Sequence, residues 1–359
     1  MKKKIRVLVV DDSLLVRQIL SQGLQEDSDL EVVAAVNDPY EARDAIALHK
    51  PDVLTLDVEM PKMNGVEFLR KMMPQCPIPV VMVSSLTERG QKITMDALAT
   101  GAVDFVAKPR ANIAMGLTQM MKELREKVKT ASTANVSHWR NRNYHPMQKP
   151  VVATNDHEKK NPSKRLIAIG ASTGGTEALK DVLETFTPNM PGTLIVQHMP
   201  KGFTRMFAER LNGFCNITVK EASEGDLVCD GHAYIAPGGQ QMEVNRTSQG
   251  YVIRIFDGES VCGHCPSVEV MMQSVAKAAG KNAVGAMLTG MGNDGATGMK
   301  TMRSMGAHCV AQDEASCVVF GMPRKALECG GAEKAVPLSE MTRTLKSLLM
   351  NQYCAGNKI

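Results

Sequence analysis

The sequence lacks any apolar run long enough to cross a membrane. Of its 359 residues, 43% are hydrophobic, yet no uninterrupted apolar stretch reaches the roughly 18 residues that a membrane-spanning helix needs. The N-terminus, MKKKIRVLVV, is basic and then apolar like a signal peptide, but the apolar part stops at Asp11 and Asp12 without a cleavage site of small residues. We therefore expect a cytoplasmic protein that is not inserted in a membrane and that begins with a β-strand.

A disulfide framework and a cysteine-rich metal site are also missing. The nine cysteines are an odd number and are scattered along the chain, which is typical of reduced thiols in the cytoplasm. Cys262 and Cys265, in CGHCP, have the spacing of zinc ligands, but no second pair accompanies them. The cysteines therefore favour neither a disulfide scaffold nor a zinc centre.

The chain has little excess charge of either sign. Its net charge is +4, and residues 130–164 account for all of it, with six basic residues against two acidic ones. The remaining sequence is balanced and lacks the basic surplus of a nucleic-acid-binding domain. We therefore predict that nucleic acid is not a partner.

The same basic segment predicts a break between two domains. It is rich in Asn, Thr, Ser, Lys and Pro and poor in apolar residues, as linkers are. We assign a receiver-sized domain to residues 1–126, a flexible linker to 127–164 and a second domain to 165–359. A plain tether is the favoured interpretation, and Trp139 and Tyr144 are the residues that would instead make the linker a docking segment.

The first domain alternates short apolar runs with helical stretches. The apolar runs are rich in β-branched residues and occupy residues 5–10, 31–36, 52–56, 79–83 and 103–107. Asp38 is placed to cap a helix that begins with Pro39. Five such repeats predict a doubly wound, five-stranded parallel sheet, in which ligands bind at the carboxyl ends of the strands.

Polar residues stand at four of these strand ends. They are Asp11 and Asp12, Asp57, Ser84 and Ser85, and Lys108. Three clustered carboxylates repel one another unless a cation joins them, and oxygen ligands suit Mg²⁺. A lysine and a hydroxyl beside them suit an added anionic group such as a phosphoryl. Helix capping after strands would explain one or two of these positions but not all four, so we predict a magnesium and phosphoryl site.

The motifs VVDDS, LDVEMPKMNG, VVMVSS and DFVAKP resemble the receiver domain of two-component response regulators, over residues 1–126. The resemblance implies that a histidine kinase phosphorylates Asp57, that Ser84 and Lys108 contact the phosphoryl group, and that Phe105 is an aromatic switch residue. It also implies Mg²⁺ ligands, namely Asp11, Asp12, Asp57 and the backbone carbonyl of Glu59. A receiver is a switch, so the output function is expected after the linker.

The second domain opens with IAIGASTGG at residues 167–175. A dinucleotide-binding G-x-G-x-x-G pattern fails because Ser172 replaces its second glycine, and a P-loop fails because Thr176 stands where lysine is required. The pattern G-x-S-x-G fits fully, and it presents a serine on a tight strand-to-helix turn with helix N–H groups nearby to hold an oxyanion. We therefore predict that Ser172 is a nucleophile.

A nucleophilic serine needs a base, and the base needs an orienting acid. His198 ends the apolar run TLIVQH and so projects from a strand end, whereas His264 precedes a helix and is not excluded by this argument. Asp294 lies in a glycine-rich loop after AVGAMLT and is the best candidate for the acid, although Asn-Asp-Gly is also common turn chemistry. We expect the three side chains to converge at one edge of a mainly parallel sheet.

GASTGG, QHMP, IAPGG, HCPSVE and LTGMGNDG, in this order, resemble the chemotaxis protein-glutamate methylesterase family, CheB. The resemblance implies that Ser172, His198 and Asp294 are the catalytic triad and that backbone N–H groups of Thr173 and Met291 form the oxyanion hole. It further implies that methyl-accepting chemotaxis receptors are the substrates, through demethylation of glutamate methyl esters and deamidation of glutamines. No cofactor is expected for this reaction.

One departure from the family and two alternative functions remain. Cys265 stands where the family usually carries arginine, which would alter the grip on an acidic receptor surface. A second domain that binds DNA would need a helix-turn-helix and a basic face, and the charge count indicates neither after residue 165. A catalytically inactive scaffold that only docks receptors conflicts with the intact Ser-His-Asp set. We expect the unmodified receiver to obstruct the catalytic face and phosphorylation of Asp57 to relieve this.

Overall fold

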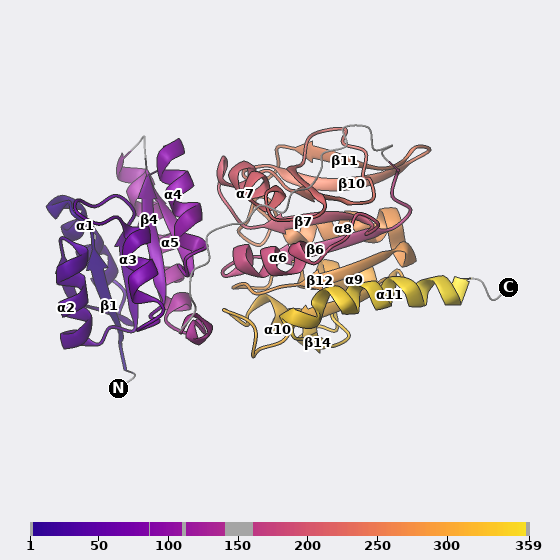
Figure 1. Ribbon diagram of the computed structural model, residues 1–359. Coiled ribbons are helices and arrows are strands. Elements are labelled where there is room, and N and C mark those ends of the chain that lie inside the picture. Colours follow the sequence, from indigo (N-terminus) through magenta and orange to yellow (C-terminus); the bar gives the residue numbers. More distant parts are fainter. Residues whose placement is uncertain (1–2, 86, 110–112, 141–160, 357–359) are drawn as a thin grey trace. The chain divides into compact units, whose positions relative to one another are not determined.

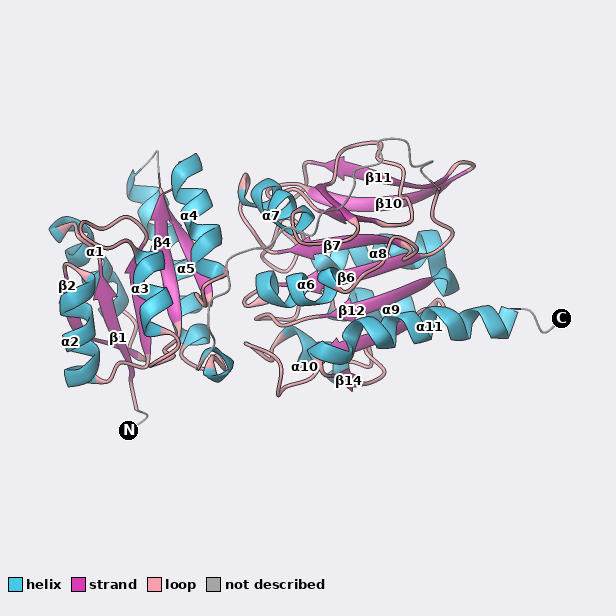
Figure 2. Ribbon diagram, in the orientation of Figure 1, coloured by secondary structure: helices cyan, strands magenta, loops and turns pink. Residues whose placement is uncertain are grey.

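The structure is a computed structural model that describes residues 3–85, 87–109, 113–140 and 161–356. The chain divides into two compact units, with the boundary between residues 146 and 147. Each unit is built around its own parallel sheet (Figures 1 and 2). Within the described residues, no helix combines the length and the apolarity that crossing a membrane requires.

The N-terminal unit has five parallel strands in the order β2-β1-β3-β4-β5. The strands are β1 (Ile5–Val10), β2 (Leu30–Val36), β3 (Val53–Asp57), β4 (Val80–Ser85) and β5 (Asp104–Lys108). The helices are α1 (Leu14–Gln25), α2 (Pro39–His49), α3 (Gly65–Met72), α4 (Glu88–Leu98) and α5 (Ile113–Ala131). Because strand crossovers are right-handed, the change of direction after β2 places helices on both faces of the sheet. The predicted doubly wound fold is confirmed.

Local sequence signals explain how these elements start and where they are buried. Asp38 caps α2 as predicted, because its Oδ1 accepts the N–H groups of Tyr40 at 2.9 Å and Glu41 at 3.0 Å, and Pro39 occupies the first turn. Strand β3 is buried along its whole length, as expected for a parallel sheet with both faces covered.

The N-terminal unit extends beyond residue 126, where we predicted the end of the first domain. Helix α5 continues to Ala131, and a short 3₁₀ helix, η1 (Ser137–Trp139), follows it. Trp139 is only 8% exposed and packs over Gly101, where an added Cβ would lie 3.0 Å from the indole ring. The indole thus buries its apolar surface against its own unit, so residues 127–140 belong to the N-terminal unit. Tyr144 lies outside the described residues.

The C-terminal unit has a seven-stranded sheet in the order β14-β13-β12-β6-β7-β9-β8, in which all neighbouring strands are parallel. The strands are β6 (Leu166–Ala171), β7 (Gly192–Gln197), β8 (Thr218–Glu221), β9 (His232–Ile235), β12 (Ala283–Met287), β13 (His308–Gln312) and β14 (Ala335–Val336). A separate antiparallel hairpin contains β10 (Gln241–Thr247) and β11 (Gly250–Phe256). The predicted mainly parallel sheet is confirmed.

The helices in the described part of this unit are α6 (Gly175–Glu184), α7 (Phe203–Asn212), α8 (Val268–Ala279), α9 (Ala296–Ser304), α10 (Met322–Glu328) and α11 (Met341–Gly356). Two short 3₁₀ helices are η2 (Gly280–Asn282) and η3 (Leu338–Glu340). Helices α8 and α9 pack with strands β6 and β12 and the β10-β11 hairpin in one apolar core that includes Val268, Met271 and Met299. This core fixes α8, whose first turn enters the site described below.

The arrangement of the central strands determines where the site can form. Strand β6 lies between β12 and β7, and Ala171 at its end is paired with Gln197 at the end of β7 (Figure 2). On the other side, Gly170 is paired with Met287 at the end of β12. The residues that follow these three strands therefore emerge at one edge of the sheet, where parallel α/β folds place their ligands.

Candidate active site and acidic pocket

Ser172 occupies a tight turn between β6 and α6. Its backbone N–H donates to the carbonyl of Thr289 at 3.0 Å, and its own carbonyl accepts the N–H of Gly175 at 2.7 Å. Gly290 lies so close that an added Cβ would stand 2.7 Å from the Cβ of Ser172. The glycine-rich loop after β12 therefore packs closely against the serine and holds the turn in place.

His198 follows the neighbouring strand at the matching position. Its backbone N–H donates to the carbonyl of Ala171 at 3.2 Å, which ties it to the residue before Ser172. The imidazole is buried, and its Nε2 lies 2.8 Å from Oδ2 of Asp294. The structure thus brings the three predicted strand ends together and pairs the histidine with the predicted acid.

Asp294 is buried, and protein groups hold its carboxylate from several sides. Oδ1 accepts the hydroxyl of Ser267 at 2.7 Å and the N–H of Glu269 at 3.0 Å, and Oδ2 accepts the N–H of Val268 at 2.8 Å. Burial alone would raise the pKa of Asp294, but the hydrogen bonds from His198, Ser267 and the backbone outweigh it and lower the pKa. The carboxylate also sits at the N-terminus of α8, where the helix dipole favours a negative charge.

The ionisation of Asp294 assigns the roles of the two ring nitrogens of His198. Because the carboxylate is an acceptor, Nε2 carries the hydrogen, which leaves a lone pair on Nδ1. Nδ1 is buried and has no hydrogen-bond partner within the structure. It is therefore the ring nitrogen available to accept the proton of a serine hydroxyl.

The two predicted oxyanion donors lie next to the nucleophile. Thr173 follows Ser172 directly and is buried, with its carbonyl accepting the hydroxyl of Thr289 at 3.0 Å. Met291 follows Gly290, the residue that crowds against Ser172, and its side chain is 37% exposed. Both residues are thus placed around the serine, and their role in stabilising an oxyanion remains a prediction.

Sequence reasoning missed one residue of this site, Ser267, and left the place of another, His264, open. Ser267 is fully buried and caps α8 while it donates to Asp294, and the cap position before an apolar helix was a signal that could have identified it. His264, which the sequence left open as a possible base, lies with its ring stacked on His198. Asp294 pairs with His198, so the structure favours His198 as the base.

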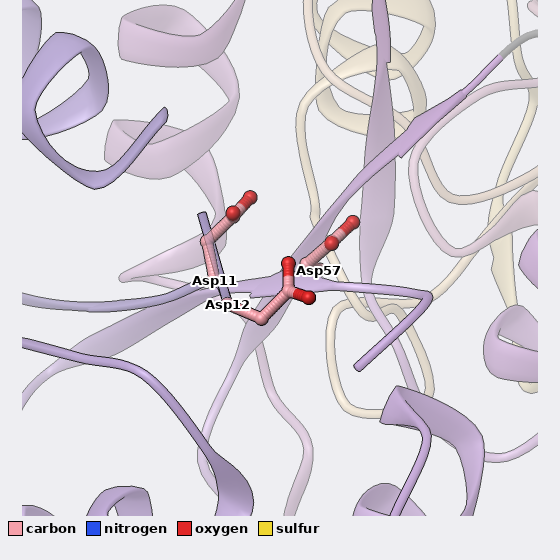
Figure 3. Close-up of side chains that lie close together, drawn as sticks. All are labelled: Asp11, Asp12 and Asp57. Carbon is pink, nitrogen blue, oxygen red and sulfur yellow. The ribbon is translucent and has the colours of Figure 1, made fainter. Parts of the chain in front are cut away.

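In the N-terminal unit, three carboxylates meet at the ends of β1 and β3. Single oxygens of Asp11, Asp12 and Asp57 all lie within 4.8 Å of one another (Figure 3). Lys108, at the end of β5, places Nζ 2.9 Å from Oδ2 of Asp11 and 3.0 Å from Oδ1 of Asp57. Four of the predicted strand-end residues, namely Asp11, Asp12, Asp57 and Lys108, are thus assembled into one acidic pocket.

The electrostatics of this pocket fit a divalent cation. Burial, together with the negative charge of Asp11, raises the pKa of Asp57 to about 6, although Lys108 acts in the opposite direction. One ammonium group cannot balance three carboxylates, and carboxylate oxygens are ligands that Mg²⁺ prefers. The pocket is therefore an acidic site of the kind that holds Mg²⁺ in receiver domains.

The remaining predicted residues of this unit have different surroundings. The hydroxyl of Ser84 is buried and lies 2.6 Å from the hydroxyl of Thr94 in α4. The Phe105 ring is buried, with Nζ of Lys127 5.3 Å from its centroid. The side chain of Glu59 pairs with Arg89 at 3.3 Å, which leaves only its backbone carbonyl for the predicted metal role.

Models of two known families match the two units of the chain. The sequence model of the CheB methylesterase family matches residues 167–345, and that of the response regulator receiver domain matches residues 7–129. A protein-glutamate methylesterase/protein-glutamine glutaminase from Syntrophotalea carbinolica is 58% identical over 355 residues, which cover 97% of this chain and 99% of that protein. The chain belongs to the CheB methylesterase family. The predicted enzyme class, a protein-glutamate methylesterase/protein-glutamine glutaminase that carries a receiver domain, is confirmed.

Further CheB relatives support the same assignment. A protein-glutamate methylesterase/protein-glutamine glutaminase of Escherichia coli (strain K12) is 52% identical over 345 residues, covering 95% of this chain and 96% of that protein. The crystal structure of the Thermotoga maritima CheB methylesterase catalytic domain is 32% identical and matches with a TM-score of 0.50, covering 51% of this chain and 98% of that one. The fold of the C-terminal unit is therefore that of a CheB catalytic domain.

Proposed function

We propose that Ser172, His198 and Asp294 hydrolyse glutamate methyl esters on methyl-accepting chemotaxis receptors and deamidate glutamines on the same proteins. The observation that carries this proposal is the 2.8 Å contact between Nε2 of His198 and Oδ2 of Asp294, beside the turn that bears Ser172. The names of the relatives combine the same two activities.

The first half-reaction forms an acyl-enzyme. Nδ1 of His198 takes the proton of Ser172 while Oγ attacks the ester carbonyl carbon, and Asp294 stabilises the resulting imidazolium. Backbone N–H groups of Thr173 and Met291 bind the negatively charged oxygen of the tetrahedral intermediate. When the bond between the carbonyl carbon and the methoxy oxygen breaks, His198 returns the proton, and methanol leaves.

The second half-reaction restores the serine. Nδ1 of His198 takes a proton from water, whose oxygen attacks the acyl carbon, and the proton then passes to Oγ of Ser172 as the ester bond breaks. The product is a free glutamate side chain. With a glutamine substrate the first leaving group is ammonia, and all later steps are the same. Besides the receptor, the reaction consumes one water molecule for each ester or amide hydrolysed.

We further propose that a histidine kinase controls the enzyme by phosphorylating Asp57. The residues that would hold Mg²⁺ are Asp11, Asp12, Asp57 and the backbone carbonyl of Glu59. When bound, the ion neutralises negative charge during phosphoryl transfer. Lys108 contacts the phosphoryl group. The hydroxyl of Ser84 gives up its hydrogen bond with Thr94 and bonds to the phosphoryl group instead. Phe105 acts as the aromatic switch residue. The kinase and receptors imply that the protein works in the cytoplasm.

Methanol release from methylated receptors by the full chain, with and without a small-molecule phosphodonor, tests the reaction. We expect Ser172→Ala to lower kcat by about 10⁴-fold or more, because it removes the nucleophile. Ser304→Ala, which removes a hydroxyl on α9 that donates to the carbonyl of Thr301, is the matched control and should leave kcat unchanged. Substantial methanol release by Ser172→Ala would contradict the proposed mechanism.

A further inference from the structure

A second imidazole lies flat on the catalytic one. The ring centroids of His198 and His264 are 3.6 Å apart, and the ring planes differ by 9°. This distance is short for aromatic side chains, whose centroids in proteins are commonly about 4.5–7 Å apart. The face of the catalytic base is therefore covered by a single, closely stacked partner.

The catalytic imidazole has few other restraints on its orientation. Nε2 is fixed by the contact with Asp294, but Nδ1 has no hydrogen-bond partner within the structure. The terminal torsion of a histidine side chain has broad energy minima, so one hydrogen bond leaves the ring free to swing about the Nε2–Oδ2 contact. Such a swing would move Nδ1 away from the position that the proposed proton transfer requires, and a ring stacked on the face of His198 opposes it.

His264 is itself held in place by its backbone. Its N–H donates to the carbonyl of Val261 and its carbonyl accepts the N–H of Val261, both at 3.0 Å. The two residues between them, Cys262 and Gly263, have φ values of 53° and 83°, as the tight two-residue turn of a hairpin requires. The side-chain amide of Gln241 also donates to the carbonyl of His264 at 3.5 Å. The ring is therefore presented by a closed hairpin.

The same stretch of chain also orients Asp294. Three residues after His264, the hydroxyl of Ser267 donates to Asp294, and the N–H of Ser267 donates to the side chain of Gln241 at 2.9 Å. Gln241 therefore ties the hairpin to the capping residue of α8. Residues 261–269 thus restrain His198 twice, at its face through His264 and at its edge through Asp294.

We propose that His264 is a positioning residue for the hydrolytic reaction: its ring face keeps the His198 imidazole in the plane in which Nδ1 meets Oγ of Ser172. The inference rests on the proposed function of the triad. It gives His264 a role that needs a flat aromatic ring and needs no proton transfer by His264 itself.

Three variants of the full chain test this role. His264→Ala removes the ring that stacks on His198. His264→Phe keeps an aromatic ring there but removes the ring nitrogens. His232→Ala is the matched control, because His232 stacks on Tyr234 and not on His198. Two readouts are measured: kcat and KM for methanol release from methylated receptors, and the rate at which a fluorophosphonate labels Ser172. Thermal unfolding of each variant shows whether the fold is retained.

We expect His264→Ala to lower kcat and the labelling rate about fivefold to tenfold, the effect of losing one aromatic pair, with KM unchanged. His264→Phe should restore both to within about twofold of the parent, and His232→Ala should change neither. If His264→Ala does not fold, His264→Gln replaces it, because glutamine keeps a polar side chain without a ring face.

Three results would overturn the proposal. Equal loss in His264→Phe and His264→Ala would show that ring nitrogens, not the ring face, are needed. A higher KM at constant kcat would make His264 a receptor contact, and unchanged kinetics in all variants would remove any role. Ser172→Ala separates these results from failure of the triad assignment: if that variant keeps its activity, the proposed function itself is wrong.

Discussion

The orientation of His198, the proposed base, depends on Ser267 as well as on Asp294. The Ser267 hydroxyl donates to Oδ1 of Asp294 at 2.7 Å and accepts the N–H of Glu269 at 3.1 Å. It is buried at the start of α8, so no water can replace it without a rearrangement. One small side chain therefore both caps a helix and fixes the acid that holds His198.

We expect Ser267→Ala to affect catalysis and stability together. Loss of the hydrogen bond lets the carboxylate turn, so kcat for methanol release should fall about tenfold, which corresponds to about 1.4 kcal/mol. Loss of the cap should lower the free energy of unfolding by about 1 kcal/mol. Steady-state kinetics and denaturant unfolding of the same preparation measure both effects.

Ser274→Ala is the control for this variant. Ser274 lies on the same helix, farther along α8 from the carboxylate of Asp294. Its hydroxyl accepts the N–H of Val244 at 3.0 Å. The Ser274→Ala protein should have a lower free energy of unfolding and an unchanged kcat. A Ser267→Ala protein with unchanged kcat would show that Asp294 does not need this donor.

Residue types after apolar runs predicted that Ser172, His198 and Asp294 converge, because parallel strands bring their carboxyl ends together. The same logic could not predict the stacking of His264 or the bond from Ser267 to Asp294. These contacts depend on a hairpin and a helix start that meet the loop after β12 only in the folded chain. Periodicity in the sequence does not report such side-chain pairings.

At the scale of secondary-structure elements, α4 and β4 are linked by a buried pair of hydroxyls. Ser84 at the end of β4 lies 2.6 Å from Thr94, and its hydroxyl also reaches the carbonyl of Gly90 at 3.3 Å. The predicted contact between Ser84 and a phosphoryl group on Asp57 requires this hydroxyl. In the proposed mechanism, phosphorylation therefore competes with α4 for Ser84, and the Thr94 bond favours the unphosphorylated arrangement.

We expect Thr94→Val to make the receiver easier to activate. Valine keeps the shape of threonine but cannot bond to Ser84, so the unphosphorylated state loses about 1 kcal/mol. The phosphodonor concentration that gives half of the maximal esterase stimulation should fall about fivefold. The measurement is methanol release against the concentration of a small-molecule phosphodonor.

Thr100→Val is the matched control for this experiment. Thr100 is also buried, but its hydroxyl donates to the carbonyl of Asp96 at 2.6 Å and not to Ser84. The phosphodonor concentration that gives half of the maximal stimulation of the Thr100→Val protein should match that of the parent protein. A Thr94→Val protein that needed as much phosphodonor as the parent, or more, would contradict the competition.

The order of elements in the N-terminal unit was predictable because each strand is a compact apolar run. The end of that unit was not. Trp139 stands alone in a polar segment, and its packing partner, Gly101, lies far back in the sequence at the start of the loop before β5. An isolated aromatic residue belongs to no periodic apolar pattern, so the sequence does not predict that it is buried. The burial of Trp139 follows only from the position of α5 in the fold.

At the scale of the whole molecule, the two units perform chemistries with different requirements. The N-terminal pocket gathers Asp11, Asp12 and Asp57 into an acidic site of the kind that holds Mg²⁺. The C-terminal site pairs His198 with an aspartate that the protein itself stabilises. Regulation and catalysis should therefore respond separately to the removal of metal.

We expect chelation of Mg²⁺ by EDTA to abolish the stimulation of the full chain by a phosphodonor and to leave the basal rate of methanol release unchanged. Asp57→Asn without EDTA should show the same pattern, because it removes the phospho-acceptor. Stimulation that survives EDTA would argue against the metal in phosphoryl transfer. A fall in the basal rate would argue against a metal-free esterase.

We also expect a protein consisting of residues 165–359 to release methanol faster than the unphosphorylated full chain. The reason is that the proposed inhibition resides in the N-terminal unit and is relieved by phosphorylation. The comparison uses equal molar concentrations and the same receptor preparation. Equal rates would rule out inhibition by the unmodified receiver.

The carboxylate of Asp294 has a consequence for acid stability. The fold lowers its pKa, so the ionised form stabilises the native state fully above the ordinary value of about 3.9 and loses this contribution as the pH falls through the folded pKa. One proton on this group would release the catalytic imidazole and also remove the anion from the N-terminus of α8. Acid therefore weakens the enzyme's chemistry and one of its core helices in a single titration.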